Sequence, residues 1–192
     1  MAREATFPLN SGSQHTRVTS LRKELKMTNG YLVALVAVMA LVGLSQPARA
    51  TSNDVEGLKK TAITYVHTTA VGLGAAVRDV TNVEARLKII RDFIDPVRFF
   101  PDQSGYFYVY NFDCVNVAHA TQKDLVGKNL FKHKDSRGKF DIQELSATAK
   151  KGGGFVEYYW AKPGSKGEFK KLGYVEPIPG TDYFIGTGIY LP

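Results

Sequence analysis

The stretch of sequence that decides the fold lies between residues 104 and 190. It holds five short runs of aromatic and β-branched residues: GYFYVY (105–110), VNVAH (115–119), GFVEYYW (154–160), LGYV (172–175) and YFIGTGIY (183–190). Such residues favour strands, and turn residues bound each run. The tyrosines of the first run stand at every second position, which predicts that they share one face of a sheet.

Two helices are predicted ahead of these strands. The first begins at about Asn53, in a stretch that resembles a capping box, and its apolar residues recur every three or four positions. These are Val55, Leu58, Ala62, Val66, Ala70, Leu73, Val77 and Val80. The second helix begins at about Asn82, and Asp95-Pro96 ends it because the residue before a proline is driven out of the α region. Helices followed by an antiparallel meander, with a helical insertion in residues 120–151, indicate an α+β fold.

Composition and charge argue for one globular domain that does not bind nucleic acid. The chain has 192 residues and a formal charge of +7, but its first fifty residues hold six Lys/Arg against two Asp/Glu. The remaining 142 residues have a net charge of only +3. That charge is too small and dispersed to indicate a surface that follows a phosphate backbone.

The N-terminal fifty residues have the pattern of a secretory signal peptide. An apolar run of fourteen residues (31–44) follows Arg22, Lys23 and Lys26 and precedes Ala48-Arg49-Ala50. The run is short for a bilayer span of about 20 residues, and small-x-small is the pattern at which signal peptidase cleaves. We predict cleavage after Ala50 and a domain at residues 51–192 in the periplasm or outside the cell. The n-region is long, so Met27 is an alternative start, and an uncleaved anchor at residues 31–44 is the alternative to cleavage.

Cys114 is the only cysteine, so the chain cannot form an internal disulfide. We interpret it as a small turn or core residue, because free cysteines are usually buried and inert.

Five blocks of the chain, in order, resemble the single Cache domain (type 2), an extracytoplasmic sensor domain related to PAS. They are GYFYVY with Ala118-His119, LVGKNL (125–130), GFVEYYW with Lys162-Pro163, KLGYV (171–175) and IGTGIY (185–190). The resemblance covers residues 53–190 and implies a long N-terminal helix and a second helix packed on an antiparallel sheet of five to six strands. Two positions depart from the family, which usually has glycine at Cys114 and proline at Ala120. These departures suggest a changed turn and loop.

The family also implies a ligand site on one face of the sheet, beneath the segment between the second and third strands, where small carboxylates or amino acids bind. Transferred to this chain, the candidate residues are Arg98, Tyr106, Tyr108, Tyr110, His119, Tyr158, Trp160, Lys171 and Tyr174. A small anion requires a positive charge, from Lys171 or Arg98, and hydroxyl or indole donors in an apolar cavity. The alternative is that the tyrosines are half-buried packing residues and His119 satisfies a nearby backbone group.

The leading interpretation is a sensor without catalytic activity or cofactor, acting in signal transduction or chemotaxis. Family members are mostly receptor ectodomains, and because this chain ends at Pro192 we expect a free-standing form that signals through a membrane receptor partner. A second interpretation is an enzyme centred on His119 with Asp113, Glu157 or Ser104, although no nucleophile elbow or phosphate-binding loop is present.

Two further interpretations remain open. The chain could be a partner-binding module that forms a homodimer through the apolar stripe of the helix from Asn53. It could also hold haem through His67, His119 or His133, although the sequence lacks the Cys-x-x-Cys-His pattern of covalent attachment. No second ligand stands at metal-binding spacing from His119, so no metal site is predicted.

Overall fold

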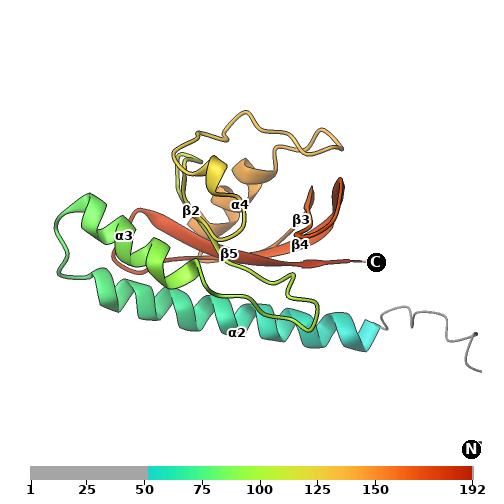
Figure 1. Cartoon of the computed structure of the whole chain (residues 1–192), viewed down its shortest axis with the longest axis horizontal. Coiled ribbons are helices and arrows are strands. Elements are labelled where there is room, and N and C mark those ends of the chain that lie inside the picture. Colours follow the sequence, from blue (N-terminus) through green and yellow to red (C-terminus); the bar gives the residue numbers. More distant parts are fainter. Residues whose placement is uncertain (1–51, 192) are drawn as a thin grey trace, which may run out of the picture. The chain divides into compact units, whose positions relative to one another are not determined.

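The computed structural model describes residues 52–191, and the predicted signal peptide lies outside this range. Helix α2 (Ser52–Val77) runs along one face of the sheet (Figure 1). The predicted apolar stripe is buried from Ala62 to Val77, but the helix ends before Val80. The predicted cap depends on the side chain of Asn53, which lies outside the side chains that the structure describes. Within residues 52–191, no helix combines the length and the apolar character that a membrane span requires.

Helix α3 (Val83–Ile94) begins and ends as predicted. Asn82 is its cap, since Asn82 Oδ1 accepts a hydrogen bond from the backbone N–H of Ala85 at 2.9 Å. The helix stops at Ile94, just ahead of Asp95-Pro96. Its buried residues Leu87 and Ile90 join those of α2 in one apolar cluster.

The sheet has five antiparallel strands, as the resemblance implied. They are β1 (Tyr108–Asn111), β2 (Asn116–His119), β3 (Gly154–Ala161), β4 (Glu168–Pro177) and β5 (Tyr183–Tyr190). Their spatial order is β2-β1-β5-β4-β3, so β5 pairs with β1 in the middle of the sheet instead of forming an edge as in a simple meander. Strand β4 is longer than predicted because residues 168–171 also pair with β3.

The two faces of the sheet bury different kinds of side chain. Helices α2 and α3 pack against one face, over an aliphatic and phenylalanine core that includes Val109, Val117 and Ile185. The opposite face carries the tyrosines and Trp160. The candidate site therefore lies on the face away from α2.

Residues 120–151 cover that second face (Figure 1). The segment contains a short 3-10 helix, η1 (Lys123–Leu125), and α4 (Asp141–Lys150), which is the helical insertion that the sequence predicts. Asp135 fastens the loop to the sheet: its Oδ1 accepts from the backbone N–H of Lys139 at 2.9 Å and its Oδ2 from that of Tyr159 at 3.0 Å.

The two departures from the family pattern fit the local backbone. Cys114 is buried in the β1–β2 turn at φ +66°, a conformation in which glycine is usual. The backbone N–H of Ala120 donates to the carbonyl of Phe107 at 3.1 Å, a bond that proline would be unable to form. The changed turn and loop thus leave the strands paired.

Candidate ligand-binding site

Three tyrosines at the start of the sheet line one face, as their alternation predicts. Tyr106, Tyr108 and Tyr110 are all buried, and successive ring centroids lie 6.5 and 5.8 Å apart. Tyr158 on β3 joins them and donates to Tyr108 Oη at 3.4 Å. Burial raises the pKa of Tyr106 to about 12 and also raises the pKa values of Tyr108 and Tyr158. These side chains therefore present neutral hydroxyls.

Glycines on β4 and β5 leave the room that these rings occupy. A Cβ at Gly186 would lie 2.7 Å from ring atoms of Tyr108, and one at Gly173 would lie 2.8 Å from Cε1 of Tyr158. A Cβ at Gly188 would overlap Cε of Lys171. The three glycines thus form a flat floor under the rings and the lysine chain.

Lys171 lies over this floor with its ammonium group among phenol rings. The residue is 0% exposed, and its Nζ donates to Tyr106 Oη at 2.8 Å. Nζ also lies 4.2, 5.3 and 5.0 Å from the ring centroids of Tyr106, Tyr108 and Tyr190. The negative faces of aromatic rings attract a cation at these distances.

Lys171 nevertheless has no countercharge. None of the ion pairs formed within residues 52–191 includes it. Removal from water lowers the pKa of Lys171 well below its ordinary value. An anion in the cluster would supply the missing charge, and the neighbouring hydroxyls would donate to it.

His119 adds a neutral imidazole to the cluster. Its Nδ1 accepts from the backbone N–H of Gln122 at 3.0 Å, which places the ring proton on Nε2. Burial, helped by the charge of Lys171, lowers the pKa of His119 to about 3. Its ring stacks on Tyr108 and on Trp160, whose indole N–H donates to Gln122 Oε1 at 2.8 Å. His119 is therefore a hydrogen-bond donor without charge at neutral pH.

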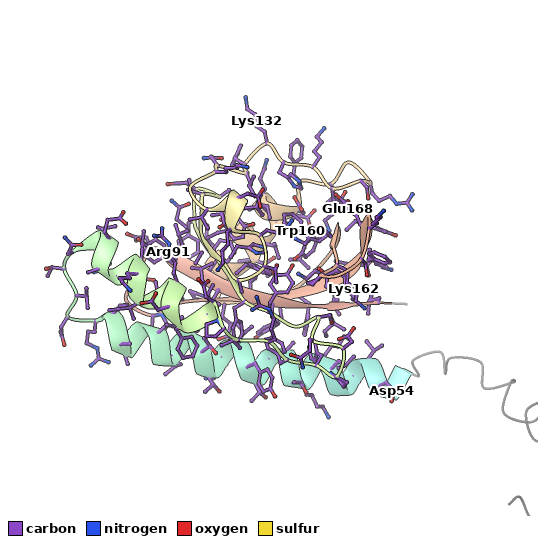
Figure 2. The ribbon with its side chains drawn as sticks, in the orientation of Figure 1. Asp54, Arg91, Lys132, Trp160, Lys162 and Glu168 are labelled. Atoms are coloured by element: carbon purple, nitrogen blue, oxygen red, sulfur yellow. The ribbon has the colours of Figure 1, made fainter. Side chains whose placement is uncertain are left out.

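Helix α4 closes the cluster from above. Ile142 and Leu145 face Tyr110, His119 and Trp160 across a space too small for a water molecule. Figure 2 shows Trp160 in the crowded layer of side chains between the sheet and residues 120–151. A ligand can reach this layer only if α4 or its flanking loops move.

Comparison with known proteins identifies the family. The sequence profile of the Cache domain matches residues 60–192. The chain belongs to the Cache domain family. A methyl-accepting chemotaxis protein from Vibrio parahaemolyticus superposes with a TM-score of 0.62 at 31% identity, over 71% of this chain and 90% of that one. A Cache chemosensory domain solved to explain its carboxylic acid recognition superposes at 0.63 with 27% identity, over 74% of this chain and 99% of that one.

Two signalling proteins contain sequences homologous to this Cache domain. The sensor histidine kinase MctS of Rhizobium johnstonii is 39% identical over 89 residues, which are 46% of this chain and 19% of MctS. The methyl-accepting chemotaxis protein McpP of Pseudomonas putida is 25% identical over 166 residues, 83% of this chain and 30% of McpP. The chain thus spans less than a third of either relative, and the homology concerns sensor domains of kinases and chemoreceptors.

Tyr174 does not join the cluster of the Cache domain. Strand positions three apart point to opposite faces, so Tyr174 faces away from Lys171. Its ring packs on Phe155, with centroids 4.8 Å apart, and its hydroxyl donates to Glu176 at 2.7 Å. The prediction that Tyr174 lines the same pocket as Lys171 was wrong because it ignored this alternation.

Arg98 also lies outside the cluster. Its guanidinium donates to the carbonyls of Asp95 and Val97 near the end of α3, and to that of Ala120 at 2.7 Å. These bonds hold the end of α3 against the end of β2. Arg98 therefore positions the backbone beside His119, and the central cation is Lys171.

Three residues of the cluster were not predicted. Tyr190 faces Tyr106, with their hydroxyls 3.3 Å apart, and its period-two spacing from Gly186 and Gly188 was a signal that could have identified it. Asn116 and Asp141 are fully buried at the other end of the cluster. An Asn after a turn and an Asp at a helix start are typical of local capping, so the sequence gives them no distinguishing signal.

The structure does not assemble the proposed catalytic or haem groups. Ser104 Oγ donates to Asp102 at 2.6 Å, and Glu157 pairs with Lys170 at 2.9 Å, so neither contacts His119. The remaining candidates also lie apart, since Asp113 is exposed in the β1–β2 turn and His67 pairs with Glu176, while His133 bonds to Asp141. In the described part of the chain, no cluster of three His, Cys, Asp or Glu residues could hold a metal ion.

Proposed function

We propose that this Cache domain binds a small carboxylate between Lys171 and the row of Tyr106, Tyr108 and Tyr110, and that binding acts on a signalling partner. The observation that supports the proposal most directly is Lys171 itself, which is 0% exposed, free of ion pairs and surrounded by phenol rings. Leaving a cation in this state is costly unless a ligand completes it. The similarity to a domain that recognises carboxylic acids supports the same ligand class.

The groups around Lys171 match what a carboxylate requires. The ammonium would donate to one carboxylate oxygen, and His119 Nε2–H and the hydroxyl of Tyr108 or Tyr158 would donate to the other. The remaining surfaces, from Trp160 and α4, are apolar and suit a short hydrocarbon chain. Since the cluster is closed, binding must displace α4 or its flanking loops, and this movement would distinguish the bound from the free state.

The setting of the domain also belongs to the proposal. The predicted signal peptide, and the likeness to a periplasmic sensor domain of a chemotaxis protein, support a location outside the cytoplasm. A receptor or kinase in the membrane would then be the partner.

A thermal-shift screen of the purified chain against short carboxylates tests the proposal. A ligand at 100 times its dissociation constant adds about 2.7 kcal/mol of stability, a rise of several degrees in melting temperature. The variant Lys171→Met should abolish the shift. Lys170→Met is the matched control, because Lys170 is its neighbour on β4 but pairs with Glu157 on the other face. Shifts that survive in Lys171→Met would refute the site, and silence across the screen would refute the ligand class.

A homodimer formed through α2 is a second candidate role. The stripe proposed for dimerisation is occupied, because Val66, Ala70 and Leu73 pack against the domain's own core. Other apolar side chains of α2 are exposed, however, including Ile63 at 38% and Val71 at 49%, and these support a contact between two copies. Val71→Glu should reduce the sedimentation mass of the full chain if this surface forms a dimer. An unchanged mass would refute it.

A further inference from the structure

The end of the cluster opposite Lys171 contains buried polar atoms without hydrogen-bond partners. Within residues 52–191 there are three such side-chain atoms, Nδ2 and Oδ1 of Asn116 and Oδ2 of Asp141. Both residues are 0% exposed. Native proteins pair almost every buried polar group, so each exception requires a physical explanation.

The three atoms lie at one place, beside Tyr110. Asn116 is the cross-strand partner of Tyr110, so their side chains share the cluster face of the sheet. Asp141 is the first residue of α4, next to Ile142, which lines the cluster together with Tyr110. Burial raises the pKa of Tyr110, the neighbouring Asn116 side chain lowers it and the charge of Asp141 raises it, so both side chains lie close to the Tyr110 hydroxyl. Asp141 Oδ1 is satisfied by His133 at 2.8 Å, whereas Oδ2 is not.

This place is separate from the ammonium group of Lys171. Lys171 bonds to Tyr106, the first tyrosine of the row, whereas Asn116 and Asp141 flank Tyr110, the third. Tyr108 lies between them. A strand rises about 3.3 Å per residue, so positions 106 and 110 are about 13 Å apart along the backbone. A ligand that reached both ends would need a polar group at each.

We propose that Asn116 and Asp141 form a second polar subsite, and that the ligand is a carboxylate with a hydrogen-bond donor, a hydroxyl or an amine, at the end remote from the carboxylate. This inference rests on the proposed function. The donor would bond to Asp141 Oδ2 and Asn116 Oδ1, and Asn116 Nδ2 would donate to a hydroxyl oxygen. An ammonium group would instead be balanced by the Asp141 carboxylate.

Pairs of matched ligands, with and without the terminal donor, test the two ends of the cluster separately. Calorimetric titration of the purified full chain would compare propionate, butyrate and hexanoate with their terminal hydroxy and terminal amino derivatives, of which the hexanoate derivatives are long enough to bridge the two ends. We expect at least one donor-bearing acid to bind tenfold or more tightly than its plain parent. Asn116→Leu and Asp141→Asn should reduce its affinity to that of the parent and leave the parent's affinity unchanged, whereas Lys171→Met should abolish both.

Each outcome decides the inference. A gain for the hydroxy acid or for the amino acid supports it and identifies the donor. Equal affinity for parent and derivative would overturn the second subsite while leaving the carboxylate proposal intact. Equal losses for both acids in Asn116→Leu and Asp141→Asn would mean that these residues only support the fold, and this too would overturn it. If no acid in the panel binds, both proposals fail.

Discussion

Replacing Lys171 with methionine should flatten the dependence of folding stability on pH in the range below pH 10. In the folded state, burial holds the pKa of Lys171 well below its ordinary value of 10.5, which applies to the unfolded chain. As the pH falls below 10.5, the unfolded chain takes up a proton at this lysine and the folded chain does not. Stability is therefore lost as the pH falls, until the folded-state pKa is reached.

The size of this pH dependence follows from one proton, which the unfolded chain binds at Lys171 and the folded chain does not. A difference of one bound proton changes the free energy of unfolding by about 1.4 kcal/mol per pH unit. Methionine has a similar length and does not ionise, so this contribution should vanish. The variant also loses the hydrogen bond to Tyr106, about 1 kcal/mol. Because methionine can never be charged, the slope is a clearer measurement than the stability at one pH.

Urea denaturation at a series of pH values provides the measurement. The series should stop near pH 9, since the tyrosines have raised pKa values and begin to reduce stability above about pH 10, where the unfolded chain ionises. Lys170→Met should keep the slope of the wild-type chain. If Lys171→Met also kept it, Lys171 would have the same pKa in both states, and the argument from an uncompensated buried lysine would be refuted.

Four further substitutions have defined outcomes. Since the pKa of His119 is about 3 in the fold, stability should fall by about 4 kcal/mol as the pH drops from 6.5 toward 3, and His119→Gln should remove that loss from an acid titration. Gly72→Ala should raise stability by about 1 kcal/mol because nothing lies within 4 Å of the new Cβ, whereas Gly74→Ala should lower it by about 1–3 kcal/mol because its Cβ would lie 2.7 Å from the carbonyl oxygen of Pro179. Asn116→Leu should raise the free energy of unfolding by about 1–2 kcal/mol, measured as a higher urea midpoint, and a lower midpoint would mean that its amide is satisfied in solution.

The sequence predicts the elements of the fold because each has a local signal. Period-two aromatic runs identify the strands, and three- and four-residue spacings identify α2 and α3. Strand pairing has no such signal, so the return of β5 between β4 and β1 was not foreseen. The closing strand is nevertheless essential to the site, because Gly186 and Gly188 lie on it.

The sequence predicts the part of the site that depends on the alternation of side chains between the two faces of one strand. Tyr106, Tyr108 and Tyr110 line one face as expected, and Lys171 was already a candidate, but its position on the cluster face follows only from the register between β3 and β4. In that register Lys171 stands opposite Tyr158, so the two share the cluster face. The same alternation excludes Tyr174. The unpaired atoms of Asn116 and Asp141 depend on the placement of α4, which no periodicity encodes.

The two faces of the sheet differ in what they contribute to stability, and β5 connects them. The face under α2 and α3 is apolar and well packed, whereas the cluster face holds an unpaired lysine and unpaired Asn and Asp atoms, each of which destabilises the free domain. A ligand that satisfied these groups would stabilise that face and press on β5 at Gly188, where no side chain separates Lys171 from the strand. Ile185, on the other side of β5, packs in the same core as α2. We therefore expect ligand binding to change the amide hydrogen exchange of α2. An unaltered exchange pattern would mean that binding transmits no signal through this helix.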